Sequence, residues 1–190
     1  MVVRSVSGDH TEYPVVETVQ KDHICHVVTA PCSIDAAQQK KASALARSAI
    51  EAVQALGCFG VEMFLTREGE ILINELAPRV HNSGHYTIEA CPCSQFENHI
   101  RSILGWPLGD TSLVKPAAVM INLLGVGEGP PLPQGINEAL QNADVHLHIY
   151  GKSDSRKGRK MGHLTLIGDH MEETTQQAIS LASQLVFGNA

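Results

Sequence analysis

No run of about 18 apolar residues occurs in this 190-residue sequence, and no signal-peptide pattern is present. We therefore expect no membrane span. An excess of positive charge is also missing, because the formal net charge is −6. An acidic chain gives nucleic-acid binding no general electrostatic support, so we expect no nucleic-acid partner.

A paired cysteine framework is absent as well. The five cysteines are an odd number and lie in apolar or loop settings, which indicates reduced thiols in an intracellular protein. Cys91-Pro92-Cys93 is too tight and too isolated for a zinc site, so a structural role is the better interpretation. The sequence shows no internal repeat, and its length predicts one moderately sized unit or two small ones. It begins directly in the strand-like segment Val2–Val6, which suggests a truncated product.

The most informative stretch holds two short apolar segments, Gly60–Thr66 and Glu70–Leu76, joined by a glycine-bearing turn. This pattern predicts a β-hairpin. If Glu68-Gly69 forms a two-residue loop, Glu62 lies opposite Glu75 and shares a face with it. Two carboxylates about 4 Å apart repel by about 4 kcal/mol at an effective dielectric near 20. The pair therefore favours a divalent cation between the two glutamates.

Two other interpretations of the hairpin remain open. Both carboxylates could lie in water on an edge hairpin, and a slip of one residue would place them on opposite faces. The segment that follows, NELAPRVHNSGH, favours a ligand site because it gathers a cation, two imidazoles, an amide and a hydroxyl in one loop. In this loop Arg79 offers a fork suited to carboxylate or phosphate. Ser83-Gly84 allows the backbone to approach a ligand closely.

The segments around this hairpin form a predicted scaffold. An antiparallel meander is expected first, with strands Val2–Val6, Glu12–Thr18 and His23–Thr29. A helix capped by Ser33 or Asp35 is then predicted to run to about Leu56, with one apolar stripe on the sheet. A later helix, Ser94–Leu104, is predicted to bury Phe96, Ile100, Ile103 and Leu104.

A break at Gly105–Gly109 predicts a domain boundary, which divides residues 1–108 from residues 109–190. The second part is predicted to contain the strands Ala117–Leu124, Val145–Tyr150 and Leu164–Ile167 and a terminal helix, Glu172–Phe187. His146 and His148 alternate with apolar residues, which indicates a solvent-facing position rather than a metal site.

A basic segment lies between the last two predicted strands. From Lys152 to Lys160 it carries five cations in nine residues, within an otherwise acidic chain. Such a cluster indicates an anion site, and a solvated basic turn is the alternative.

Several motifs together resemble a known family. GVEMF followed by NELAPRVHNSGH is similar to the metal-binding hairpin and substrate loop of ATP-grasp enzymes, most closely the 5-(carboxyamino)imidazole ribonucleotide synthases of purine biosynthesis. The resemblance continues through YPVVET, SQFENHIRSILGWPLG and YGKSDSRKGRKMGHLTL, and so covers nearly the whole chain. It implies an α+β fold in which residues 1–108 form the C-terminal lobe of an ATP-grasp domain, an antiparallel sheet with helices. Residues 109–190 would form a small β-rich C-terminal domain.

The resemblance also implies an activity. Such enzymes join bicarbonate to the amine of aminoimidazole ribonucleotide and consume ATP through a carboxyphosphate intermediate. By this resemblance Glu62 and Glu75 would hold Mg²⁺ on the ATP phosphates, with a weaker contribution from Asn74. Arg79 would stabilise the carboxyphosphate anion. The residues that would position bicarbonate and the imidazole are His81, Asn82, Ser83 and His85.

Two basic residues match positions that grip the ribotide phosphate in the family. Lys152 would act as a point charge and Arg159 as a bidentate donor. The chain departs from the pattern at Ala77, where many ATP-grasp enzymes carry a metal-binding asparagine. By strand alternation Asn74 points to the face opposite Glu75, and the general base is unassigned.

The glycine-rich loop and lysine pair that hold adenine and phosphates in the family are missing, and with them the N-terminal part of the enzyme. The resemblance therefore implies an inactive fragment of an enzyme that is homodimeric at full length and cytoplasmic, or stromal in a plant plastid. Two alternatives are a non-catalytic ligand-binding or interaction module that keeps the ATP-grasp lobe, and an unrelated two-carboxylate metal hydrolase. The complete set of Glu62, Glu75, Arg79 and His85 favours the enzyme fragment.

Overall fold

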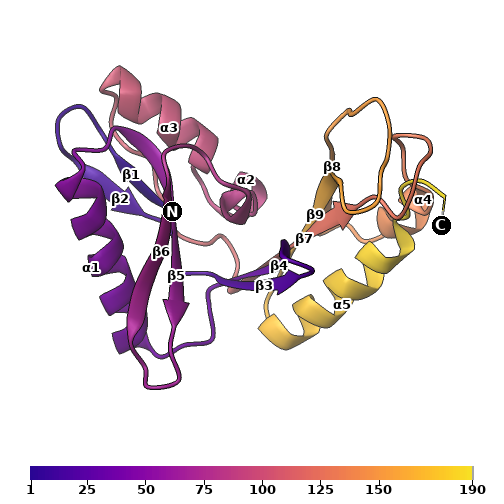
Figure 1. The fold of residues 1–190 in the computed structure, drawn as a ribbon, viewed down its shortest axis with the longest axis horizontal. Coiled ribbons are helices and arrows are strands. Elements are labelled where there is room, and N and C mark those ends of the chain that lie inside the picture. Colours follow the sequence, from indigo (N-terminus) through magenta and orange to yellow (C-terminus); the bar gives the residue numbers. More distant parts are fainter. Residues whose placement is uncertain (190) are drawn as a thin grey trace. The chain divides into compact units, whose positions relative to one another are not determined.

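The computed structural model describes residues 1–189, which form two compact units (Figure 1). Unit 1 contains Met1–Glu17 and Pro31–Val114, and unit 2 contains Thr18–Ala30 and the chain from Lys115 onward. Each unit is a sheet with helices packed on it, which confirms the predicted α+β class. Within residues 1–189 no helix combines the length and the apolar character that crossing a bilayer requires.

Unit 1 is built on a four-stranded antiparallel sheet in the order β2-β1-β5-β6. Its strands are β1 (Val2–Arg4), β2 (His10–Glu12), β5 (Gly57–Leu65) and β6 (Ile71–Ala77). Its helical segments are α1 (Ala36–Ala52), the 3-10 turn η1 (Asn82–Gly84), α2 (Thr87–Ala90) and α3 (Gln95–Leu104). The hairpin and the loop singled out by the sequence therefore belong to one unit.

Alternation along β5 determines which of its side chains enter the core. Phe59, Val61 and Met63 pack against a buried cluster that includes Ile50 of α1. Because successive side chains of a strand point to opposite faces, the even-numbered residues face away from α1. Glu62 is one of these residues, and the sheet thus presents it on the face opposite its core helix.

Helix α1 begins at its predicted cap, where the Asp35 carboxylate accepts a hydrogen bond from a backbone N–H of the first turn at 2.8 Å. The helix ends at Ala52, earlier than the predicted end at Leu56. Gln54 adopts a left-handed φ of 49°, which stops the helix. The predicted apolar stripe is buried only as far as Ile50, and Leu56 is exposed.

The predicted buried face of α3 is wrong. The predicted apolar residues Phe96, Ile100, Ile103 and Leu104 are between 40 and 54% exposed. The buried residues of this helix are instead Gln95, Asn98 and Ser102. These polar side chains face inward because they hold loops: the Asn98 amide bonds both the backbone N–H and the carbonyl of Gly109 and the hydroxyl of Tyr13.

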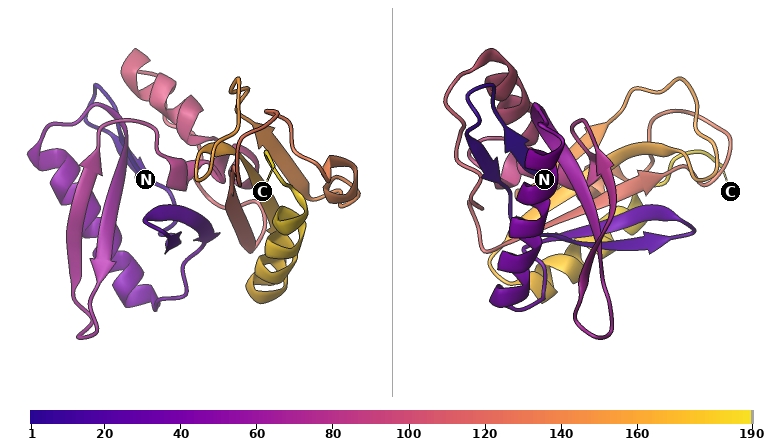
Figure 2. Two further views of the ribbon diagram at one scale, coloured as in Figure 1. Left: turned by 45° about the vertical axis from the view of Figure 1, so that its right-hand side comes forward. Right: turned by 60° about the vertical axis from the view of Figure 1, so that its left-hand side comes forward.

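Unit 2 contains a five-stranded sheet in the order β3-β4-β7-β9-β8. Its strands are β3 (Glu17–Lys21), β4 (Ile24–Ala30), β7 (Ala117–Leu124), β8 (Val145–Ile149) and β9 (Lys160–Gly168). The short helix α4 (Ile136–Ala139) and the long helix α5 (Met171–Gln184) complete the unit. Helix α5 packs along β7 and β9 (Figures 1 and 2). It covers a core of buried apolar residues.

The predicted N-terminal meander is wrong, because its strands are divided between the two sheets. Strand β1 pairs with β2 in the sheet of unit 1, whereas β4 lies between β3 and β7 in the sheet of unit 2. A two-residue turn, Asp22-His23, joins β3 to β4 with both residues at positive φ, 51° and 61°. Local alternation predicts a strand but not its partner, and Thr18–Ala30 consequently lies in unit 2. The structural division therefore differs from the predicted boundary between residues 108 and 109.

Two histidine rings stack within unit 2. His148 of β8 lies on His163 of β9, with ring centroids 4.4 Å apart and planes 11° apart. The Tyr150 hydroxyl and His163 Nδ1 are 2.9 Å apart. His148 is half-buried, since His163 covers one face of its ring, and it alternates with Leu147 and Ile149, which pack on the core.

Candidate active site

The hairpin of β5 and β6 pairs Glu62 with Glu75, which confirms the predicted pairing. Nearer the turn the register shifts by one residue, because a β-bulge on β6 leaves Asn74 between two paired positions. The turn is also longer than the predicted two residues: the N–H of Thr66 bonds the carbonyl of Glu70 at 2.8 Å. The bulge breaks the strict alternation on which the predicted direction of Asn74 depended.

A third potential ligand joins the two carboxylates. One ligand atom each of Glu62, Glu75 and His81 lies within 4.8 Å of the other two. Nε2 of His81 is 3.6 Å from a Glu62 oxygen, and the His81 side chain is only 13% exposed. The imidazole can approach because Gly60 has no side chain: a Cβ there would lie 2.8 Å from the His81 ring.

These three groups fit a hard divalent cation. Mg²⁺ is bound in proteins through one or two carboxylates together with substrate phosphates and water, and this pair supplies the carboxylates. The imidazole is a less favoured ligand for Mg²⁺, so Glu62 and Glu75 are the residues that would hold the ion. His81 lies at the side of that position, where it can bond another group bound there.

The loop after β6 carries the other predicted site residues. Arg79 is exposed, and its guanidinium donates to the carbonyl of Val80 at 3.1 Å. His81 caps the turn η1, and its Nδ1 lies 2.9 Å from the Ser83 hydroxyl. Asn82 starts that turn and accepts the N–H of His85 through its carbonyl at 3.1 Å. The structure therefore gathers Arg79 to His85 on one loop beside the carboxylate pair.

Sequence reasoning missed the residue that supports this loop, Gln95. Its amide is fully buried and bonds the backbone N–H and the carbonyl of His81 at 2.9 and 2.8 Å. The same amide lies 3.0 Å from Nδ1 of His85. Only its place in the motif SQFENH could have drawn attention to it, since no periodic pattern marks a buried amide.

The basic segment forms a cluster of cations around one carboxylate in unit 2. Arg159 donates to Asp154 at 2.8 Å, and Arg156 lies 3.2 Å from the other oxygen of the same carboxylate. Lys152 donates to the carbonyl of Lys160. Burial, together with the nearby charges of Arg159 and Arg156, lowers the pKa of Lys152. An anion stabilises such crowding of like charges, and here the Asp154 carboxylate already contacts two of the cations; phosphate binding by Lys152 and Arg159 stays a prediction. Asp154 is the partner that the sequence did not reveal.

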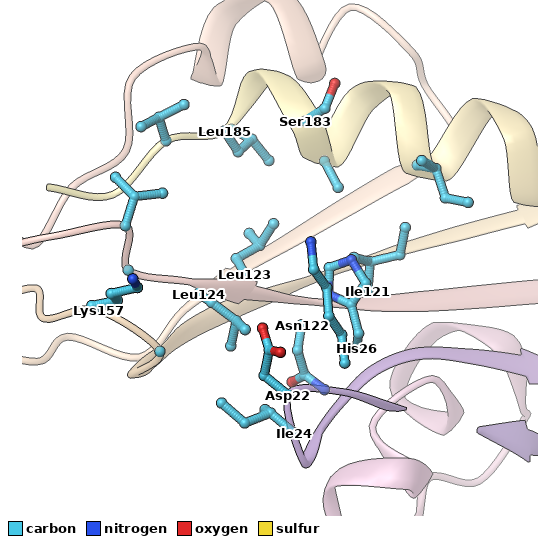
Figure 3. Close-up of a pocket in the computed structure, with 17 residues that line it drawn as sticks. Asp22, Ile24, His26, Ile121, Asn122, Leu123, Leu124, Lys157, Ser183 and Leu185 are labelled. Atoms are coloured by element: carbon cyan, nitrogen blue, oxygen red, sulfur yellow. The ribbon is translucent and has the colours of Figure 1, made fainter. Parts of the chain in front are cut away.

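A separate pocket of about 530 Å³ opens in unit 2, where β4 and β7 face the end of α5 (Figure 3). Its lining is mainly apolar, from Ile24, Ile121, Leu123 and Leu185. The basic segment contributes Lys157 and Gly158 to it, but neither of the two residues predicted to bind phosphate. The charged cluster is the better candidate for an anion site, because it brings Lys152, Arg156 and Arg159 close together.

Comparison with known proteins decides the family. The ATP-grasp domain family matches residues 1–96, which is 96 of 190 residues. The chain belongs to the ATP-grasp family. This ATP-grasp chain also matches the "Phosphoribosylaminoimidazole carboxylase C-terminal domain" over residues 118–177. The two matches fall on the parts that carry the carboxylate pair and the basic segment.

Similar proteins extend well beyond this ATP-grasp chain. A phosphoribosylaminoimidazole carboxylase of Schizosaccharomyces pombe is 47% identical over 91% of the chain, which covers 32% of that protein. An N5-carboxyaminoimidazole ribonucleotide synthase of Bacillus subtilis is 44% identical over 93% of the chain and 45% of its own length. The chain thus spans 32 to 45% of the length of these relatives.

Solved structures agree with this likeness. The N5-carboxyaminoimidazole ribonucleotide synthetase of Thermotoga maritima matches all of the chain and 51% of its own, with a TM-score of 0.91 and 46% identity. A synthase from Aspergillus clavatus, solved with ADP and 5-aminoimidazole ribonucleotide, matches 96% of the chain and 49% of its own. Its TM-score is 0.85 at 40% identity.

Proposed function

We propose that the chain is the C-terminal portion of an ATP-dependent ligase that carboxylates the amine of aminoimidazole ribonucleotide with bicarbonate. The observation that supports this most is the convergence of Glu62, Glu75 and His81, in a chain that matches both an ATP-grasp domain and a carboxylase C-terminal domain. A relative of similar structure carries ADP and 5-aminoimidazole ribonucleotide. In this proposal Mg²⁺ is held by the two glutamates, while Asn74 contributes from the bulge beside them.

The reaction has two steps. An oxygen of bicarbonate attacks the γ-phosphorus of ATP, and the bond to the bridging oxygen breaks, which gives carboxyphosphate and ADP. The ribotide amine then attacks the carboxyl carbon; the carbon–oxygen bond to phosphate breaks, and the nitrogen loses a proton. The ion supplies charge neutralisation at the transferred phosphoryl group.

The residues of this chain hold the reactants during these steps. Arg79, exposed on the loop, binds the carboxyphosphate anion through its fork. The residues that orient bicarbonate and the imidazole of the ribotide are His81, Asn82, Ser83 and His85. In unit 2, Lys152 and Arg159 bind the ribotide phosphate through charge-assisted hydrogen bonds.

The adenine and much of the phosphate binding come from the part of the relatives that the chain does not cover. We therefore expect no turnover from the 190-residue chain alone, and a homodimeric, cytoplasmic enzyme at full length. Turnover by the isolated chain above a Glu62→Ala control would contradict the proposal.

Steady-state kinetics of the full-length protein tests the phosphate site. Each charge-assisted hydrogen bond contributes about 1.5–3 kcal/mol, so Arg159→Ala should raise the KM for the ribotide about tenfold or more, since 1.4 kcal/mol is a factor of ten. The KM for ATP should stay nearly constant. Lys157→Ala is the matched control. Arg156 is less suitable, because it contacts the same Asp154 carboxylate as Arg159. An equal rise in the KM for the ribotide in Arg159→Ala and Lys157→Ala would contradict a defined phosphate site and indicate only general attraction by the basic segment.

A further inference from the structure

The first residue of α3, Gln95, has its side chain directed toward the loop of the candidate active site. Its amide bridges the backbone of His81, with Oε1 accepting the N–H at 2.9 Å and Nε2 donating to the carbonyl at 2.8 Å. A backbone N–H can only donate and a carbonyl can only accept. These two contacts therefore fix the orientation of the Gln95 amide. If its oxygen and nitrogen were exchanged, a donor would face the N–H of His81 and an acceptor would face its carbonyl.

This fixed orientation determines the role of a second imidazole. The Nε2 of Gln95 also lies 3.0 Å from Nδ1 of His85. An amide nitrogen offers two hydrogens and no lone pair, so Nδ1 of His85 must accept. A neutral imidazole that accepts at Nδ1 carries its proton on Nε2. The ring is further held by stacking on Phe96, with centroids 5.6 Å apart.

The surrounding backbone keeps the amide in place. The hydroxyl of Thr87 donates to the carbonyl of Gly84 at 2.6 Å and accepts the N–H of Gln95 at 2.9 Å. Gly84 allows this approach, because a Cβ there would lie 2.5 Å from Oε1 of Gln95. Two backbone groups of His81 thus hold the amide directly, and the Thr87 hydroxyl ties the backbone of Gln95 to that of Gly84.

We propose that Gln95 is a positioning residue that holds His85 as the Nε2–H tautomer while it fixes the backbone of His81. The loop then presents one imidazole that donates a hydrogen bond and a second imidazole beside the carboxylate pair. The inference rests on the proposed function in one respect only: His85 is taken to be one of the residues that orient the reactants. A purely structural Gln95 would hold the loop, and the tautomer of His85 would have no effect on turnover.

Nuclear magnetic resonance of this chain, labelled with ¹⁵N at histidine, tests the tautomer directly. Long-range proton–nitrogen spectra at about pH 8.5, where ordinary imidazoles are neutral, distinguish a protonated Nε2 from a protonated Nδ1. A His85→Gln variant assigns the signals. We expect His85 to show its proton on Nε2, and a proton on Nδ1 would overturn the inference whatever any variant does.

Gln95→Glu supplies the matched perturbation, because a carboxylate keeps the size of the amide but cannot donate. Nδ1 of His85 must then donate, so its proton should move to Nδ1. Gln39→Leu is the control, since the Gln39 amide also donates to backbone carbonyls of the same unit, those of Cys32 and Ile34. An unchanged His85 spectrum in Gln95→Glu, or an equal change in Gln39→Leu, would overturn the inference.

Kinetics of the full-length protein separates this inference from the proposed function. Gln95→Glu should lower kcat by about 10–100-fold, the usual loss when a residue that orients site groups is replaced, and Gln39→Leu should not. A wild-type enzyme without ribotide-dependent ATP turnover would contradict the proposed function and leave the tautomer result standing. A wild-type kcat retained in Gln95→Glu would overturn the positioning role even if turnover is confirmed.

Discussion

Replacing Glu75 with glutamine should change the stability of the chain in opposite directions without and with a divalent cation. The ligand atoms of Glu62 and Glu75 lie within 4.8 Å of each other. Two unit charges at that distance repel by about 3.5 kcal/mol at an effective dielectric of about 20. Both side chains are accessible to water, and interactions between exposed charges are usually worth about 1 kcal/mol or less. Without metal, Glu75→Gln should therefore raise the free energy of unfolding by up to about 1 kcal/mol.

With Mg²⁺ the order should reverse. A ligand that binds only the folded state adds RT ln(1 + [L]/Kd), which is about 1.4 kcal/mol when the ion is at ten times its Kd. Glu75→Gln removes one of the two carboxylates and should lose most of this gain.

Urea unfolding at constant ionic strength, with a chelator or with increasing Mg²⁺, measures both effects. Glu68→Gln is the control, because Glu68 is an exposed carboxylate in the turn of the same hairpin. Equal stabilisation of the wild type and Glu75→Gln by Mg²⁺ would refute the metal assignment. A metal-free Glu75→Gln less stable than the wild type would refute the argument from repulsion.

Three further predictions concern the scaffold and the anion site. Burial raises the pKa of Cys58 to about 12, so the folded state keeps a proton that the unfolded thiol loses above about pH 8.5. The free energy of unfolding should therefore fall as the pH rises from there. In urea unfolding between pH 8 and about pH 10.5, the midpoint should fall less for Cys58→Ala than for the wild type. Asn98→Leu should lower the free energy of unfolding by about 1–3 kcal/mol, because it leaves buried backbone groups unpaired. Ile100→Gln, on the exposed face of the same helix, should change that free energy by no more than about 0.5 kcal/mol. Equal losses of the two variants in urea unfolding would contradict the burial of the polar face of α3. Because the pKa of Lys152 is lowered, phosphate binding should take up a proton at alkaline pH. Calorimetry should therefore show the affinity for inorganic phosphate falling before pH 10.5 is reached. This fall should persist in Lys157→Met and be absent in Lys152→Met.

The carboxylate pair could be predicted because it depends on local pattern. Apolar alternation and a glycine-bearing turn predicted the hairpin, and the pairing of Glu62 with Glu75 was correct. The correct pairing nevertheless came from a wrong turn: the real turn is longer, and the bulge at Asn74 restores the register. A bulge leaves no periodic signal in the sequence. It adds one unpaired residue, which shifts the pairing register but does not change the composition of the strand.

The parts that failed depend on contacts distant in the sequence. The inward face of α3 was predicted from its apolar residues, but Asn98 and Gln95 are buried because they bond loops at other positions in the chain. Likewise β4 joins a sheet through β7, whose position no local pattern indicates. Hydrophobic periodicity describes a helix packed on apolar neighbours and misassigns one that supports polar loops. The family resemblance predicted the fold class despite these errors, but it did not identify Gln95 or Asp154.

The central claim is that the full-length protein carrying this chain transfers bicarbonate carbon to the amine of aminoimidazole ribonucleotide, at a site whose carboxylates are Glu62 and Glu75. Carbon-13 bicarbonate supplied with ATP, Mg²⁺ and the ribotide tests it most directly, with the product followed by carbon NMR and ADP measured in parallel. We predict one labelled carbamate on the exocyclic amine for each ADP formed, and loss of both signals together in Glu75→Gln. ADP formation without labelled product, or an unchanged rate of labelling in Glu75→Gln, would contradict the account.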